Sequence, residues 1–134
     1  MRQRLLIALR SLLALFVAIG AVQLVNVMGG WLSDVLGIAH GSHARHALDL
    51  FWAFLAGTAG AWCFVRIAAT AKRAHAWFLL VLYLALDIQI VVQMRDIWPL
   101  WFGLGVVLPV PLQVWLGWRL ATNKQQQADR LDLP

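Results

Sequence analysis

The chain has 134 residues, of which 62% are hydrophobic and only 13% are charged. A soluble domain of this length has too little interior to bury so much apolar surface, so we expect a membrane protein. The 11 Lys and Arg residues exceed the 6 Asp and Glu residues. They flank apolar runs and form no basic stripe with interleaved aromatic residues, which argues against nucleic acid as a partner. The single cysteine, Cys63, excludes an internal disulfide and a CxxC motif.

The first predicted span covers residues 5–28. Its basic start resembles a signal peptide, but Arg10 interrupts the early part and the apolar character continues to Met28, which is too long for such a segment. We therefore expect an uncleaved helix, with Arg10 reaching toward the inner headgroups. Gly29 and Gly30 are predicted to end it, since paired glycines favour a turn. The following loop, 29–46, contains a segment, 31–39, that could form a short interfacial helix.

The second predicted span covers residues 47–67 and is rich in small residues. Ala53/Gly57 and Ala56/Gly60 are small-xxx-small pairs, which allow a neighbouring helix to approach closely. The same pairs would also suit a homodimer.

The third and fourth predicted spans cover residues 76–97 and 98–120, with a turn at 95–99 between them. Pro109 and Pro111 are predicted to kink the fourth span near its middle. Residues 1–121 thus form a single transmembrane domain. Residues 122–134 form a polar cytoplasmic tail that we expect to be disordered.

The distribution of basic residues predicts the orientation. With the N-terminus inside, nine Lys and Arg residues lie on the inner side and only Arg45 and Arg95 lie on the outer side. The inner set is Arg2, Arg4, Arg10, Arg66, Lys72, Arg73, Arg119, Lys124 and Arg130. The predicted fold is an all-α integral membrane four-helix bundle, up-down-up-down, with both termini cytoplasmic. The predicted location is the bacterial inner (plasma) membrane, crossed several times.

Asp87 lies near the middle of the third span, where a carboxylate is costly and therefore a functional candidate. Tyr83 is four residues earlier on the same face, and Gln23 and Asn26 on the first span are predicted at a similar depth. These four residues form a predicted intramembrane polar site that would titrate protons or bind a cation. The alternative is a structural hydrogen-bond network that fixes the register of the helices.

In a second group, residues that can coordinate a metal ion occur at every third position: His40, His43, His46 and Asp49. The functional interpretation is a periplasmic metal ion held by His nitrogens and a carboxylate. The alternative is a hydrated helix entrance, with Ser42 as its cap and Asp49 complementing the helix dipole. No other cofactor is predicted.

Three features make the layout similar to the BphX-like small bacterial four-helix membrane proteins. They are Arg45 and Asp49 in the sequence RHALDLFWAF, the polar third span, and a glycine-containing fourth span that ends in GWRL. The resemblance implies the four-helix architecture and carries over no catalytic residue.

The sequence contains no CxxCH or HExxH motif, no glycine-rich phosphate loop and no Ser-His-Asp candidate set, so no catalytic residue is predicted. Whether the chain is an enzyme stays open, and these absences favour a non-enzymatic protein. The leading hypothesis is an accessory or small-ligand-binding bundle whose partners are the lipid bilayer and a larger membrane complex or further copies of the chain. One alternative is a proton-coupled small-molecule transporter that uses Asp87. Another is a metal-binding membrane enzyme or redox subunit that uses the histidine group.

Overall fold

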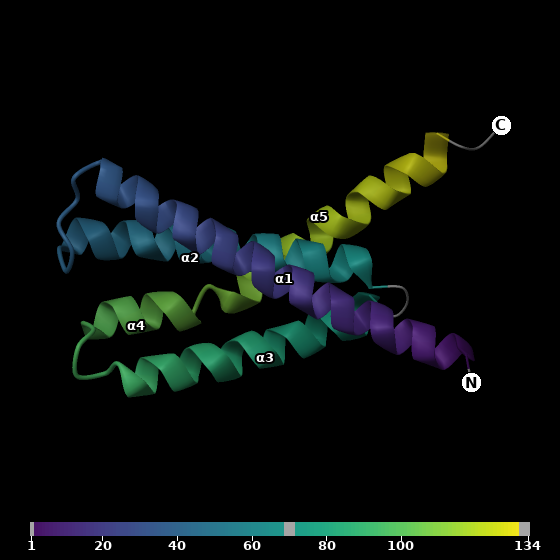
Figure 1. Cartoon of the computed structure of the whole chain (residues 1–134), viewed down its shortest axis with the longest axis horizontal. Coiled ribbons are helices and arrows are strands. Elements are labelled where there is room, and N and C mark those ends of the chain that lie inside the picture. Colours follow the sequence, from purple (N-terminus) through teal and green to yellow (C-terminus); the bar gives the residue numbers. More distant parts are fainter. Residues whose placement is uncertain (1, 69–71, 132–134) are drawn as a thin grey trace.

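The computed structural model describes residues 2–68 and 72–131, and within these ranges the chain forms five helices and no strand (Figure 1). The helices are α1 (Arg2–Val35), α2 (His43–Ile67), α3 (Lys72–Gln93), α4 (Leu100–Val107) and α5 (Val110–Leu131). The prediction of an all-helical chain is confirmed. The α1–α2 and α3–α4 connections lie at one end of the molecule, here called the loop end. The start of α1, the end of α2, the start of α3 and the end of α5 lie toward the other, the terminal end.

Helix α1 does not stop at the paired glycines, so the predicted helix end at Gly29 and the separate short helix at 31–39 are wrong. A Cβ atom built on Gly29 would overlap the indole of Trp52 on α2. The glycine therefore serves as a close contact between two helices, and the helix continues to Val35. The chain turns instead at Gly37 and Gly41, whose φ angles of 69° and 76° lie in the left-handed region that glycine adopts without strain.

Helix α2 begins four residues before the predicted position, and the predicted cap at Ser42 is confirmed. The Ser42 hydroxyl accepts a hydrogen bond of 3.1 Å from the backbone N–H of Arg45. At the other end, Arg10 Nε donates to the carbonyl of Ile67 at 3.0 Å. Arg10 thus provides a hydrogen-bond donor for a carbonyl at the end of α2, and the bond connects α1 to α2. The sequence did not suggest this role.

The predicted distortion of the fourth span at its prolines is confirmed, and it takes the form of a break between two helices rather than a kink within one. Helix α4 ends at Val107 and α5 begins at Val110, because Pro109 has no N–H to donate to the carbonyl of Gly105. Regular hydrogen bonding resumes with Gln113 N–H donating to the Pro109 carbonyl at 2.9 Å. Helix α5 then continues through Leu131, so the disorder predicted for the tail is wrong for residues 122–131; residues 132–134 lie outside the described ranges.

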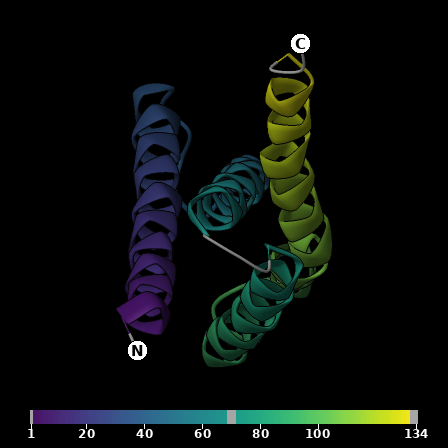
Figure 2. The same cartoon turned by 90° about the vertical axis from the view of Figure 1, so that its right-hand side faces the viewer.

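Helix α2 lies at the centre of the bundle. Figure 2 shows it between α1 and α5, with α3 to one side, and it contacts all four other helices. Its small residues make these approaches possible: Gly60 faces Val22 of α1 and the Tyr83 hydroxyl of α3, and Gly57 faces Gln113 of α5. The predicted small-residue pairs therefore pack within the bundle. The core consists of Ala14, Ala18, Ala61, Phe64, Leu79 and Val114.

The outer surface of the bundle is strongly apolar. Phe16, Val27 and Val81 are 65%, 67% and 65% exposed, and many other large apolar side chains are also exposed. Soluble monomers rarely expose contiguous apolar surface on this scale. In the described part of the chain, four helical segments are long and apolar enough to cross a membrane: Leu5–Val35, His43–Ile67, Lys72–Gln93 and Leu100–Asn123.

Candidate functional site

The first candidate is the predicted intramembrane site, of which the structure assembles one half. Tyr83 and Asp87 lie one turn apart on α3, and both are partly buried. The Tyr83 hydroxyl is enclosed against Gly60, and among the described residues it is the one buried side-chain oxygen or nitrogen without a hydrogen-bond partner. Buried hydroxyls nearly always have a partner, so this one marks a position where a further polar atom would be stabilised.

The other half of this predicted site does not join it. Gln23 and Asn26 are exposed on α1, and α1 packs mainly on α2. Within residues 2–68 and 72–131, no hydrogen bond or ion pair links either residue to Asp87. The rotation of α1 about its axis is set by Ala14, Ala18 and Gly29, which face α2 and turn the two amides outward.

The second candidate is a charge cluster at the loop end, centred on Arg45. Its side chain is only 9% exposed. Nη1 donates to Asp34 Oδ1 of α1 at 2.5 Å and Nε donates to Asp49 Oδ1 at 3.2 Å. Two carboxylates thus neutralise a nearly buried guanidinium, and the cluster fastens the end of α1 to the start of α2. The Arg45–Asp49 pair could be expected from its spacing of four residues on one helix. The role of Asp34 could not, because it requires α1 to continue past Gly29 and Gly30.

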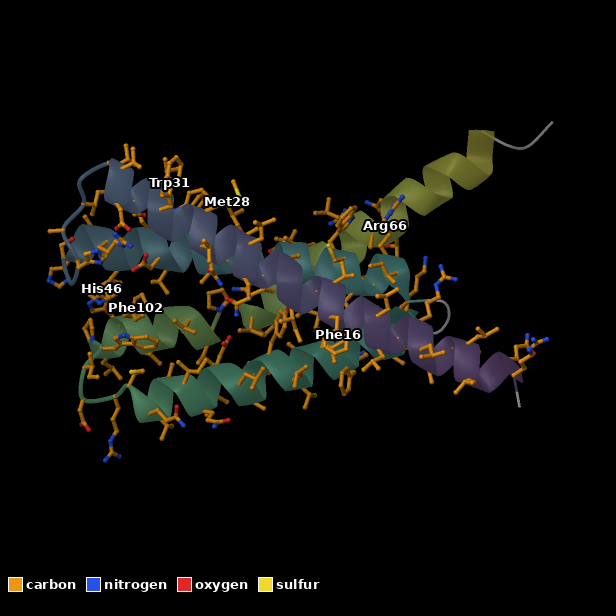
Figure 3. The ribbon with its side chains drawn as sticks, in the orientation of Figure 1. Phe16, Met28, Trp31, His46, Arg66 and Phe102 are labelled. Carbon is orange, nitrogen blue, oxygen red and sulfur yellow. The ribbon has the colours of Figure 1, made fainter. Side chains whose placement is uncertain are left out.

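The four predicted metal ligands have other neighbours. His40 lies 3.4 Å from Asp34, and Asp49 accepts from Arg45. The His43 ring packs 5.9 Å from that of Trp101. The His46 ring packs 4.8 Å from that of Phe102 across the gap between α2 and α4 (Figure 3). No three His, Cys, Asp or Glu side chains in the described ranges gather as a metal would require. The metal site stays a prediction.

The third candidate is a groove between α3 and α5 near the terminal end, here called the tryptophan groove. Its volume is about 350 Å³, within the range of roughly 300–1,000 Å³ that small-molecule sites occupy. The lining is aromatic and aliphatic with one cation: Arg73, Ala76, Trp77, Leu80, Pro111, Val114, Trp115 and Trp118. Sequence reasoning missed it, because the tryptophans are equally typical of helices that end at a membrane interface.

One arginine lines this groove, and a second lies against one of its tryptophans. Arg73 is part of the lining, and the guanidinium of Arg119 lies over the ring of Trp115, 5.1 Å from its centroid. Stacking on an indole holds a guanidinium in place while leaving its N–H groups available. Among the described side chains, neither arginine forms an ion pair.

A second groove, between α1 and α2, has a volume of about 400 Å³. Its lining is entirely apolar and aromatic: Val25, Met28, Trp31, Leu32, Trp52, Leu55 and Ala59. Met28 and Trp31 project from α1 at this position in Figure 3. Because its lining contains no charged residue, this second groove offers no charged group that could select a ligand by the sign of its charge.

No family model, curated protein or solved structure matches the chain. The resemblance to the BphX-like proteins stays a prediction.

Proposed function

We propose that the chain is a multi-pass protein of a bacterial inner membrane, with both termini in the cytoplasm. Four segments of suitable length and hydropathy support insertion. The excess of Lys and Arg on one side of these segments supports the orientation. The start of α1 and the end of α5 lie toward the same end of the molecule, as an even number of spans requires (Figure 1).

Within that membrane we propose a non-enzymatic role: the bundle binds a small apolar or amphipathic ligand, and it acts as an accessory to a larger membrane system. The tryptophan groove carries this proposal. Three indoles and an arginine around an apolar hollow of about 350 Å³ offer both apolar area and a few oriented polar groups. Rigid aromatic walls bind with little loss of side-chain entropy, which favours a ligand site over a lipid-facing surface of flexible side chains.

Filling the groove tests this proposal. Ala76 lies in its wall, and Ala76→Phe would occupy part of the hollow with a benzyl group. Native mass spectrometry of the protein released from membranes in a mild detergent should show one bound ligand fewer for Ala76→Phe than for the wild type. Ala85→Phe is the matched control, because Ala85 is exposed on the same helix and lines neither groove. Equal ligand occupancy in both variants, with unchanged helix content, would contradict the proposal.

A second candidate function is proton-coupled transport through Asp87. One observation favours it. In the described ranges the enclosed Tyr83 hydroxyl has no hydrogen-bond partner, and the Asp87 carboxylate, one helical turn away, also has no hydrogen bond. Ionisable residues at membrane depth mark proton pathways in many transporters.

A further inference from the structure

The tryptophan groove changes in polarity along its length. Its α3 wall consists of Arg73, Ala76, Trp77 and Leu80, which share one helix face. From Arg73 to Leu80 this wall extends about 10 Å along the axis. Helix α5 runs antiparallel to α3 (Figure 1), so the later lining residues of α5, such as Trp118, lie toward the same end of the molecule as Arg73, and Pro111 lies toward the middle of the spans. The groove therefore has a charged end toward the terminal end of the molecule and a purely apolar end toward the middle of the spans.

A ligand that matches this gradient has a headgroup and an apolar chain. The apolar end, lined by Leu80, Pro111 and Val114, offers no hydrogen bond to a polar ligand, so it suits a hydrocarbon chain. At the other end the indole N–H groups are donors and lie at the level where lipid headgroups begin in the proposed topology. The geometry thus favours an amphiphile that lies parallel to the helices.

The sign of the headgroup follows from Arg73, the charged residue in the lining of the groove. Arg73 lines the charged end, and Arg119, which is not part of the lining, lies over the ring of the lining residue Trp115; no described carboxylate pairs with either arginine. A guanidinium binds phosphate oxygens through two parallel N–H groups, and it repels a cationic ligand. Arg66 lies over the ring of Trp62 at the same end of the molecule but lines neither groove, so general surface charge can be separated from charge in the groove.

We infer that the tryptophan groove binds an anionic phospholipid, with its acyl chain against Leu80 and Val114 and its phosphate at Arg73. This inference depends on the proposed ligand-binding function and names the class of ligand. The groove between α1 and α2 serves as an internal comparison, because it has similar volume and no charged lining. It should accept acyl chains without regard to the headgroup.

A competition experiment tests the inference. The purified protein is mixed with equal amounts of phosphatidylglycerol and phosphatidylcholine that carry the same acyl chains, and the bound lipid is measured by native mass spectrometry. For the adduct that Ala76→Phe removes, the wild type should prefer phosphatidylglycerol. Arg73→Gln should reduce this preference about fivefold, the effect of one basic residue on an anionic lipid. Arg66→Gln removes the same charge from the same end of the protein and should leave the preference unchanged.

Each result has one meaning. If the wild type binds both lipids equally, or if Arg73→Gln and Arg66→Gln change the preference by the same factor, the inference is wrong and the proposed ligand groove stands. If Ala76→Phe removes no adduct while Ala85→Phe behaves in the same way, the proposed function itself is wrong. Circular dichroism of each variant verifies that the helices are intact.

Discussion

At the scale of single residues, Asp87 and Tyr83 allow a transport role to be separated from a structural one. Asp87 makes no hydrogen bond or ion pair within the described ranges, so Asp87→Asn should leave folding intact. If the carboxylate gains and loses a proton during transport, the same substitution should abolish proton-driven uptake or efflux, because the Asn amide does not titrate. Transport into proteoliposomes under an imposed pH gradient measures this.

Tyr83→Phe provides the control for this experiment. It removes a hydroxyl that is enclosed without a described partner, so the protein should become no less stable and could gain up to about 1–3 kcal/mol. Proton-driven transport that is unchanged in a folded Asp87→Asn variant would exclude the transporter hypothesis. A clear loss of stability in Tyr83→Phe would instead assign the hydroxyl to a structural network.

The same residues illustrate what the sequence could predict about a site. Asp87 was identifiable because a carboxylate amid apolar residues is costly in a membrane. Tyr83 followed from helical spacing, and the structure places both on one face. The direction of the Gln23 and Asn26 side chains could not be predicted from the sequence, because it depends on the rotation of α1 against α2. Small residues such as Ala18 and Gly29 determine this rotation through tertiary contacts.

At the scale of helices, close approach through glycine holds α1 and α3 against α2. A side chain at Gly60 would overlap the Tyr83 hydroxyl and Val22, and its Cβ would lie 3.3 Å from the Ala18 carbonyl. Gly60→Leu should therefore lower the free energy of unfolding by about 1–3 kcal/mol, the usual cost of overpacking. Titration from a mild detergent into sodium dodecyl sulfate, followed by circular dichroism, measures this free energy.

Gly20→Leu is the matched control, since nothing lies within 4 Å of a Cβ atom built there. It adds the same side chain to an apolar helix and should change the free energy of unfolding little. Equal destabilisation by both variants would show that loss of glycine itself, and not crowding at the α1–α2–α3 contact, is responsible.

Helix identity was predictable from the sequence, and several helix boundaries were not. Apolar runs of sufficient length indicated the four segments that could span a membrane, and Pro109 indicated the break between α4 and α5. Gly29 and Gly30 were misleading, because a glycine pair is compatible with either a turn or a tight helix contact. Trp52, which decides between these outcomes, is more than twenty residues away in the chain.

At the scale of the whole molecule, the two ends differ in how their cations are compensated. At the loop end, Arg45 is neutralised by Asp34 and Asp49. At the terminal end, Arg66, Arg73 and Arg119 form no ion pair with any described side chain. The positive-inside rule counts Lys and Arg whether or not they are paired with carboxylates, so the number of basic residues toward the terminal end supports the proposed orientation.

Cysteine labelling tests this orientation directly. In a Cys63→Ala background, Ala39→Cys places a thiol in the exposed α1–α2 connection, and Asn123→Cys places one on an exposed position of α5 toward the terminal end. A membrane-impermeant maleimide added to intact spheroplasts should label the cysteine at position 39 nearly completely. The cysteine at position 123 should react only after the membrane is permeabilised. The reverse pattern would place the charged end of the tryptophan groove at the periplasmic surface and contradict the proposed orientation. Labelling of both positions in intact spheroplasts would contradict the four-span topology, because the three spans between positions 39 and 123 must place them on opposite sides of the membrane.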